Sequence, residues 1–176
     1  MKPNLKPVFN FVSLDVKEAA IQASKLMTKL GIRHALIGGL AVGAHGFVRS
    51  TKDVDFLVSE DAFDHHVGGL VTLRSGLPFA LNNVPIDLIG TSEDVYFEDA
   101  LYSSDKSEGV PIVPIDALII LKLEAGRRRD KMDIERIYEE SGYIDWDSVF
   151  DVVEEYDKEH ATDLSERLDE ILGKFK

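Results

Sequence analysis

The chain has 176 residues, of which 44% are hydrophobic and 30% are charged, with a formal net charge of -12 and no cysteine. This composition predicts a soluble globular protein with its own core, and it excludes disordered chains, disulfide scaffolds and thiolate metal sites. The acidic balance also argues against broad nucleic-acid binding, because most of the surface would repel a polyanion.

The first regular element is an amphipathic helix. Residues 13–30 carry apolar side chains at three- and four-residue spacing, with Ser13 as a candidate N-cap and Gly31 as the residue that ends the helix. A short apolar run follows at residues 35–37 and predicts a strand. The chain therefore begins with a helix that leads into a sheet.

A glycine turn follows this strand. Gly38 and Gly39 join it to a short helix of small residues, 40–45, which Gly46 is expected to end. Residues 53–58 alternate in polarity and predict the second strand. A strand, a tight turn and a short helix therefore precede an acidic strand.

The middle of the chain mixes helical and extended patterns. Residues 60–72 are expected to be helical, and the apolar runs 78–81 and 84–89 predict two strands joined by a hairpin at Asn82-Asn83. Residues 92–109 are polar and irregular, so either a further strand or a mobile loop is expected there.

From Asp116 onward the pattern is helical to the end of the chain. Asp116 is expected to cap a helix, and three further helices are expected after it, each with its own apolar stripe. The chain is therefore interpreted as a core of residues 1–112 with a helical C-terminal extension, 113–176, packed on it.

Two carboxylates lie two residues apart in the second predicted strand. Asp53 and Asp55 point to one face of that strand, while Val54 and Phe56 point to the core. At about 4 Å such carboxylates repel by roughly 4 kcal/mol at an effective dielectric of 20, so a cation is expected between them. Oxygen ligands favour Mg²⁺ or Mn²⁺.

A third aspartate and the glycine pair complete the pattern. Asp87 interrupts another apolar strand, so it must be paired, metal-bound or at the edge of a sheet. If the two strands are neighbours, three carboxylates can hold two metals for phosphoryl transfer. Gly38 and Gly39 allow backbone N–H groups to approach phosphate closely. Each feature alone is common, but their occurrence in this order in one chain favours a functional site over a chance arrangement.

This order of motifs resembles the nucleotidyltransferases of the DNA polymerase β superfamily. Their signature is an apolar residue followed by Gly and Gly or Ser, then Asp-x-Asp or Asp-x-Glu in a strand, with a third carboxylate on a later strand. Ile37-Gly38-Gly39, Asp53-Val54-Asp55-Phe56 and Asp87 match these parts. Flanking motifs resemble the minimal, or abortive-infection (AbiEii-like), branch, and they are Gly38-Gly39-Leu40-Ala41, the run 49–55 and Arg129-Asp130-x-x-Asp133-Ile134.

The resemblance covers residues 34–137 and implies an α+β nucleotidyltransferase fold, a small mixed sheet flanked by helices. It implies that Asp53 and Asp55 ligate both metals, and that Asp87 ligates the catalytic metal and helps to activate the acceptor hydroxyl. Gly38 and Gly39 would contact the triphosphate. Many members carry Ser where this chain has Gly39, so here only the backbone amide remains for phosphate.

Three further residues are candidates for nucleotide binding. Arg49 and Thr51 precede the metal pair and are expected either to reach phosphate and orient Asp53 or to belong to a solvated loop. Lys122 lies in the apolar register of its helix, so its ammonium either snorkels to solvent or meets a buried anion. That anion is the triphosphate, Asp133 or Glu124. The run 127–131 is interpreted as a solvated basic face rather than a nucleic-acid patch.

The function expected is transfer of an NMP group from an NTP to an unidentified hydroxyl, carried by a small molecule, an RNA end or a protein. Two alternatives stay open: a catalytically silent member that serves as a binding or regulatory subunit, for example of a toxin–antitoxin-like pair, and a structural metal site. The start of the chain lacks the apolar region of a signal peptide, and no run reaches the roughly 18 apolar residues of a membrane span. A cytoplasmic protein without membrane contact is therefore expected, with a partner protein as one possibility.

Overall fold

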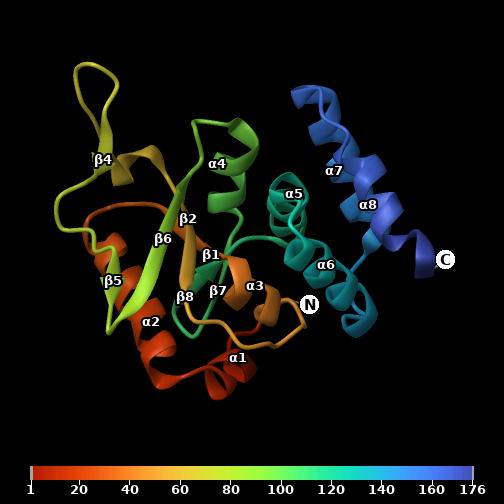
Figure 1. Cartoon of the computed structure of the whole chain (residues 1–176), viewed down its shortest axis with the longest axis horizontal. Coiled ribbons are helices and arrows are strands. Elements are labelled where there is room, and N and C mark those ends of the chain that lie inside the picture. The colour runs from red at the N-terminus through yellow and green to blue at the C-terminus, as the bar shows by residue number, and fades with distance from the viewer. Residues whose placement is uncertain (1, 176) are drawn as a thin grey trace.

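A computed structural model describes residues 2–175 and shows an α+β molecule, a mixed sheet flanked by helices with a helical C-terminal part (Figure 1). This confirms the predicted fold class. The sheet has the strand order β5-β6-β2-β1-β8-β7. Its strands are β1 (His34–Ile37), β2 (Val54–Val58), β5 (Ala80–Leu81), β6 (Val84–Gly90), β7 (Asp105–Ser107) and β8 (Val110–Ile112).

Helices cover this sheet and form the C-terminal part. They are α1 (Lys6–Phe11), α2 (Leu14–Lys29), α3 (Gly38–Ala44), α4 (Val95–Tyr102), α5 (Ile115–Ala125), α6 (Arg128–Glu140), α7 (Trp146–His160) and α8 (Leu164–Leu172). Two short 3-10 turns are η1 (Glu60–Ala62) and η2 (Gly173–Phe175). Among residues 2–175, no helix combines the length and the apolar character that crossing a membrane requires.

The predicted first helix is α2, which packs against β2, β6 and β8. Ser13 caps it, because the Ser13 hydroxyl accepts a hydrogen bond from the Val16 N–H at 3.3 Å. Gly31 follows the helix with φ +70°, a left-handed conformation that glycine adopts without strain. The start and the end of this helix are therefore as the sequence predicted.

Strands β2 and β6 lie side by side and parallel, with Asp55 directly opposite Asp87. Val54 and Phe56 are fully buried, which leaves the intervening Asp55 on the other face of the sheet. The hairpin between β5 and β6 turns through Asn82 (φ 51°) and Asn83 (φ 61°), the left-handed pair that a two-residue hairpin requires. The neighbouring strands that the carboxylate hypothesis needed are present.

The helix predicted for residues 60–72 is wrong. After η1 the chain forms an antiparallel hairpin of β3 (Phe63–His65) and β4 (Val71–Leu73), which projects at the upper left of Figure 1. Gly68 and Gly69 adopt φ +91° and +88° in its turn. Two successive glycines in this conformation reverse the chain and end any helix, and they outweigh the apolar residues at helical spacing around them.

Residues 92–109 contain more regular structure than the polar sequence indicated. Asp94 caps α4 by accepting a hydrogen bond from the Tyr96 N–H at 2.9 Å, and the strand β7 follows. The apolar side of α4, Phe97, Ala100 and Leu101, is buried. A mobile loop is therefore the wrong alternative for this segment, and the expected further strand is β7.

All four predicted C-terminal helices are present, as α5 to α8. The predicted cap at Asp116 is wrong, because Pro114 occupies the N-cap position of α5 and Asp116 instead accepts a hydrogen bond from the Tyr96 hydroxyl at 2.5 Å. Most of helix α5 is buried, with Ile119 and Ile120 fully inaccessible, because it packs on α3 and also on α6, α7 and α8. The division at residue 112 stays a prediction.

Candidate active site

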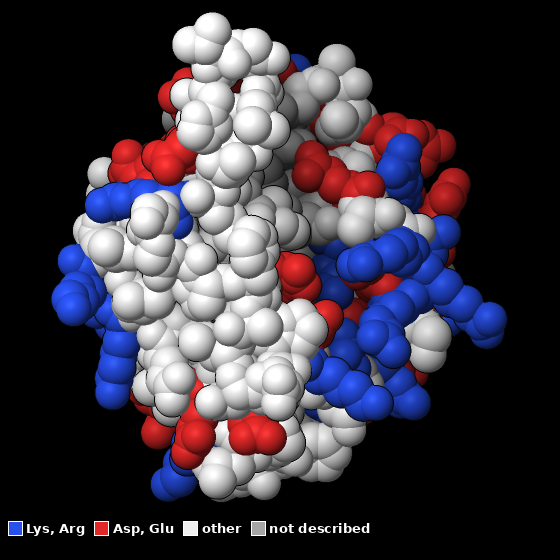
Figure 2. Space-filling model, turned by 60° about the vertical axis from the view of Figure 1, so that its left-hand side comes forward, with Lys and Arg blue, Asp and Glu red and all other residues white. Residues whose placement is uncertain are grey.

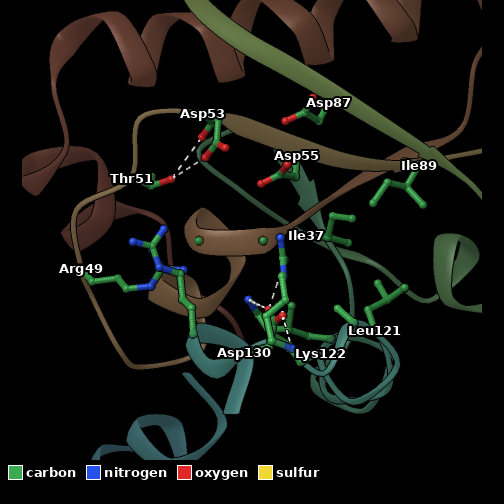
Figure 3. Close-up of a pocket in the computed structure, with 16 residues that line it drawn as sticks. Ile37, Arg49, Thr51, Asp53, Asp55, Asp87, Ile89, Leu121, Lys122 and Asp130 are labelled. Atoms are coloured by element: carbon green, nitrogen blue, oxygen red, sulfur yellow. Dashed lines mark hydrogen bonds and ion pairs between the residues drawn. The ribbon is translucent and has the colours of Figure 1, made fainter. Parts of the chain in front are cut away.

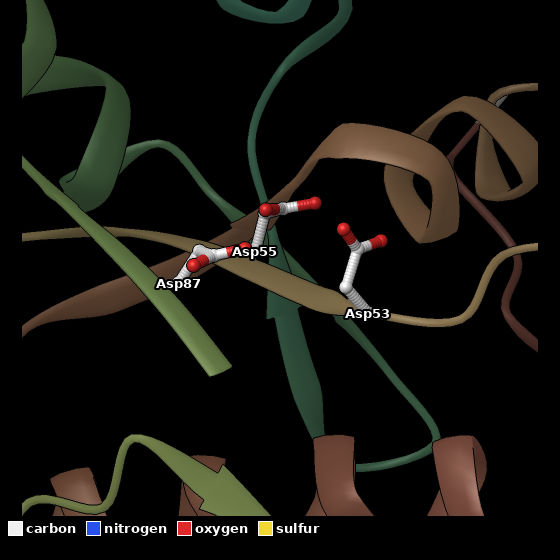
Figure 4. Close-up of side chains that lie close together, drawn as sticks. All are labelled: Asp53, Asp55 and Asp87. Carbon is white, nitrogen blue, oxygen red and sulfur yellow. The ribbon is translucent and has the colours of Figure 1, made fainter. Parts of the chain in front are cut away.

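Three aspartates that are far apart in sequence meet on one face of the sheet. Asp53 directly precedes β2, Asp55 lies within it and Asp87 lies on β6. One carboxylate oxygen of each lies within 4.8 Å of the others, and Figure 4 shows the three side chains close together beside the start of α3. The convergence expected from the sequence is therefore present.

The electrostatics of this cluster indicate a cation site. Burial, followed by the charges of Asp53 and Asp87 and a hydrogen bond with Asp87, raises the pKa of Asp55 from 3.8 to about 7, against a smaller opposing effect of Lys122. Within residues 2–175, no Lys, Arg or His forms an ion pair with any of the three carboxylates. Clustered carboxylates without a cationic partner, with Asp55 half-buried and Asp87 exposed, are hard oxygen donors that fit Mg²⁺ or Mn²⁺.

Gly38 and Gly39 bring the backbone at the start of α3 close to side chains of the site. Gly38 has φ +65°, and a Cβ there would overlap the Asp55 carboxylate. A Cβ on Gly39 would lie 3.0 Å from the Thr51 hydroxyl oxygen and 3.1 Å from an Arg49 nitrogen. Glycine is therefore required at Gly38, whereas a side chain at Gly39 would need Thr51 and Arg49 to shift slightly.

A cavity of about 440 Å³ opens over the triad and contains all eight residues that the sequence singled out. Figure 3 shows Arg49 and Thr51 on one side of this cavity, and Ile37, Ile89 and Leu121 on the other. The carboxylates lie between these two sides. The cavity is therefore polar and cationic at one end and apolar at the other.

Lys122 does not point freely to solvent. Its ammonium is buried and donates hydrogen bonds to Asp130 at 2.9 Å and to Asp133 at 2.8 Å. Of the three anions that the sequence offered, Asp133 is therefore a partner, while Glu124 instead accepts a hydrogen bond from the Tyr156 hydroxyl. Direct contact with a triphosphate is not needed to explain the burial of Lys122.

Two arginines extend this group of ion pairs. Arg49 donates two parallel hydrogen bonds to Asp133, at 2.8 and 2.9 Å, and Arg127 donates to Asp130 at 2.7 Å. Burial acts to raise the pKa of Asp130, but hydrogen bonds from Arg127 and Lys122 outweigh it, so the net shift is downward. Asp130 therefore stays ionised beneath the cavity, and together with Asp133 it is paired with three cations.

Thr51 contacts Asp53, one of the two carboxylates at the start of β2. Its hydroxyl donates to an Asp53 carboxylate oxygen at 3.1 Å, which fixes the orientation of that carboxylate. Of the two interpretations left open by the sequence, the contact favours orientation of Asp53 over a purely solvated loop. Arg49 is likewise held in place, by Asp133, next to Gly39.

The sequence interpretation missed two residues of the cavity wall. Arg127 and Arg129 line the cavity, and the Arg127 side chain is 75% exposed. They belong to the basic run that was interpreted as a solvated face. Figure 2 shows basic side chains gathered beside the hollow in which acidic side chains lie. The available signal was their position directly after the helix that carries Lys122.

Comparisons with known proteins give a distant structural likeness. No family model and no curated protein matches the sequence. Among solved structures, the chain is similar to the crystal structure of an antigenic nucleotidyltransferase-like protein from Paracoccidioides brasiliensis, with 16% sequence identity and a TM-score of 0.41. The match covers 77% of this chain and 76% of that one.

Proposed function

We propose that this chain is a metal-dependent nucleotidyltransferase, which moves an NMP group from an NTP to a hydroxyl acceptor. The observation that carries the proposal is the meeting of Asp53, Asp55 and Asp87 within 4.8 Å in a cavity with a cationic side. The same geometry supports the resemblance to the DNA polymerase β superfamily. The finer assignment to the minimal or AbiEii-like branch rests on the flanking sequence motifs alone.

The triad is the part of the site that fits a metal. Asp53, Asp55 and Asp87 would hold one or two Mg²⁺ or Mn²⁺ ions, which when bound neutralise the triphosphate and stabilise the attacking and leaving oxygens. Thr51 keeps Asp53 turned toward this position through its hydroxyl. The backbone of Gly38 passes so close to Asp55 that the nucleotide and the carboxylates share one narrow space.

The triphosphate would lie on the cationic side of the cavity. The backbone at Gly38 and Gly39 is open there, and Arg127 and Arg129 line the same wall. Beneath it, three cations are paired with two carboxylates, so the buried network carries one excess positive charge. Lys122 and Arg49 thus contribute charge from fixed positions, while Arg127, which is exposed although paired with Asp130, and Arg129 would contact phosphate oxygens.

The reaction proposed is an in-line displacement at the α-phosphorus. The acceptor oxygen forms a bond to this phosphorus while the bond to the bridging oxygen of the β-phosphate breaks, and pyrophosphate leaves with the electron pair. Asp87 accepts a hydrogen bond from the attacking hydroxyl and takes its proton. Catalysis comes from positioning and charge neutralisation, and no covalent intermediate with the protein is needed.

Calorimetric titration with a non-hydrolysable NTP tests this function. The wild type is expected to bind the nucleotide with Mg²⁺ present and at least tenfold more weakly in EDTA, and Asp53→Asn is expected to abolish that difference. Asp61→Asn, which removes an exposed carboxylate on η1, is the matched control and should behave as the wild type. Metal binding that does not change nucleotide affinity would instead support a structural metal site.

A silent binding subunit is separated from an enzyme by turnover. Release of pyrophosphate from each NTP in the presence of cell extract is the readout, with Asp87→Asn as the reference. An enzyme releases pyrophosphate at a rate that Asp87→Asn lowers by at least 100-fold. Equal rates for the two proteins would contradict catalysis and leave nucleotide binding as the function.

A further inference from the structure

One edge of the molecule is almost free of charge. Between residues 66 and 92 only Arg74 and Asp87 are charged, in a chain in which 30% of residues are charged. We call this segment, residues 66–92, the neutral edge. It contains β4, β5 and β6, and Figure 2 shows an extended uncharged surface beside the hollow with the acidic side chains.

The neutral edge exposes apolar side chains to solvent. Five of its large hydrophobic residues are exposed, and they are Val67, Leu70, Val71, Phe79 and Ile89. The Arg74 guanidinium is turned back to donate a hydrogen bond to the Leu30 carbonyl at 3.2 Å. Asp87, the only carboxylate of the segment, belongs to the aspartate triad. Exposure of apolar side chains on this scale is typical of an interaction surface.

The neutral edge includes Asp87, the residue proposed to activate the acceptor hydroxyl. Pro85, Asp87 and Ile89 alternate along β6 and so share one face of the sheet, and Ala80 is paired with Pro85 from β5. All four are exposed, and Ile89 also lines the cavity. On β5 and β6 the surface beside Asp87 on this face is thus uncharged, while Asp53 and Asp55 lie on its β2 side.

The geometry of an in-line displacement places the acceptor on the β6 side of the aspartate triad. The triphosphate side of the cavity belongs to α3 and the loop before β2, where Gly39 and Arg49 lie, and the sheet then runs from β2 to β6 and β5. Because the attacking oxygen must approach opposite the leaving pyrophosphate, the acceptor comes from beyond Asp87. The body of the acceptor therefore rests on the neutral edge.

The chemistry of this surface distinguishes the acceptor classes. A nucleic-acid end would bring phosphates beside Asp87, where the segment supplies no cation apart from the tied Arg74. A small molecule is bound in a concave site, whereas the face beyond Asp87 is exposed strand. An uncharged polypeptide matches both the lack of charge and the exposed apolar side chains.

We propose that the acceptor is the hydroxyl of a Ser, Thr or Tyr side chain in a partner protein, which docks on the neutral edge through an uncharged, apolar segment. This inference rests on the proposed nucleotidyl transfer. The side-chain oxygen forms a bond to the α-phosphorus, the bond between that phosphorus and the bridging oxygen breaks, and pyrophosphate leaves. The hydroxyl proton passes through Asp87 to solvent, and the product side chain carries an NMP group in phosphodiester linkage.

The experiment offers three acceptor pools to the wild-type protein with Mg²⁺ and each α-labelled NTP. The pools are nuclease-treated total protein, deproteinised total RNA and a small-molecule ultrafiltrate, all from the source cells. We expect label in the protein pool, in a band that protease removes and RNase does not, with an NMP added to Ser, Thr or Tyr by peptide mass spectrometry. Label confined to RNA or to the ultrafiltrate, or no labelled protein, would overturn the inference.

Surface variants test the docking face separately from catalysis. Phe79→Asp and Ala80→Asp each place a charge on an exposed position of the neutral edge, and we expect labelling of protein to fall at least tenfold. Leu14→Asp, at an exposed apolar position at the start of α2, is the matched control and should label as the wild type. Far-UV circular dichroism melts show that the three variants are folded.

Measuring nucleotide binding by the surface variants distinguishes the proposed docking face from the proposed nucleotidyl transfer. If Phe79→Asp and Ala80→Asp retain metal-dependent binding of a non-hydrolysable NTP and lose protein labelling, the docking face is supported. If they label protein as well as the wild type, the docking face is wrong while nucleotidyl transfer stands. A dimer of this chain in sedimentation that Phe79→Asp dissociates would assign the neutral edge to self-association and would also overturn the inference.

Discussion

Asp55 is the residue at which the electrostatics of the site are concentrated. It is half-buried between Asp53 and Asp87, and its pKa is raised from 3.8 to about 7 by burial first and by those two charges next. The free protein therefore holds a proton at Asp55 that the unfolded chain has already released. A bound cation replaces that proton, so metal binding and protonation compete at this carboxylate.

The contribution of Asp55 to the stability of the metal-free protein is expected to fall as pH rises from about 4 to about 7, because the folded state keeps on this carboxyl a proton that the unfolded state has released. Asp55→Asn removes this dependence, so the variant should melt several degrees above the wild type at pH 8, at roughly 2–4 °C per kcal/mol. Thermal melts in EDTA at pH 4 and pH 8 measure it. A wild-type advantage at pH 8 would contradict the account.

The same competition predicts the pH dependence of metal binding. Below pH 7 the affinity for Mg²⁺ is expected to decrease by about tenfold per pH unit, because one proton must leave Asp55 for each ion bound. Calorimetric titrations at pH 6, 7 and 8 measure this dependence. An affinity that is flat from pH 6 to pH 7 would show that Asp55 is not a ligand.

At the scale of elements, the ion pairs join α5, α6 and the loop before β2. Lys122 on α5 contacts Asp130 and Asp133 on α6, and Asp133 also binds Arg49. A buried charge group of this kind contributes less to net stability than its number of contacts implies, but it depends on every member being present. It fixes the helix pair relative to the cavity wall.

Lys122→Met is expected to destabilise the protein by about 3–5 kcal/mol, because Asp130 and Asp133 lose a buried partner. Lys131→Met, at an exposed position of the same charge on α6, should change stability by less than about 0.5 kcal/mol. Urea unfolding of both variants measures the difference. A fully stable Lys122→Met that loses only nucleotide affinity would restore direct phosphate contact as its role.

The junction between β1 and α3 gives a second prediction at this scale. Gly38→Ala forces an L side chain into φ +65° and against the Asp55 carboxylate, so metal-dependent nucleotide binding should fall at least tenfold. Gly173→Ala is the control, because a Cβ there meets nothing within 4 Å and its φ is -57°. Nucleotide titrations of both variants test this; equal affinity would show that the close approach is dispensable.

Elements with strong local signals could be predicted from the sequence. Helix α2 and the β5–β6 hairpin have periodicity, caps and turn residues that act over a few residues. The β3–β4 hairpin was mistaken for a helix, because apolar residues at helical spacing concealed the Gly68-Gly69 turn. The three aspartates were found because alternation in a strand fixes their face. The Arg49–Asp133 pair could not be found, since it joins residues 84 positions apart.

At the scale of the whole molecule, the net charge of -12 is opposed locally by cations around the cavity. Repulsion among the other carboxylates weakens the folded state and is screened by salt. A nucleotide, as proposed, would thus meet cationic side chains at the cavity of a protein whose overall charge repels anions. This separates specific anion binding at the cavity from general polyanion binding.

Salt is expected to raise the melting temperature of the protein, and MgCl₂ more than NaCl at equal ionic strength. The additional stabilisation by MgCl₂ over NaCl reflects specific binding to the triad. It should grow by about 1.4 kcal/mol for each tenfold increase in Mg²⁺ above its Kd. Thermal melts across a MgCl₂ series measure it, with Asp53→Asn as the reference. If Asp53→Asn retains the additional stabilisation, the ions bind elsewhere.

Helix α5 is enclosed by the sheet side of the molecule and by α6, α7 and α8 together. During synthesis it leaves the ribosome before the three helices that cover it, and at about 5–20 residues per second the wait lasts seconds. Nascent chains at that stage present Ile119, Ile120 and their neighbours to the cell unprotected. Chaperone demand should therefore be greatest while α6, α7 and α8 are being synthesised, and truncation after Gly126 should yield a product that aggregates.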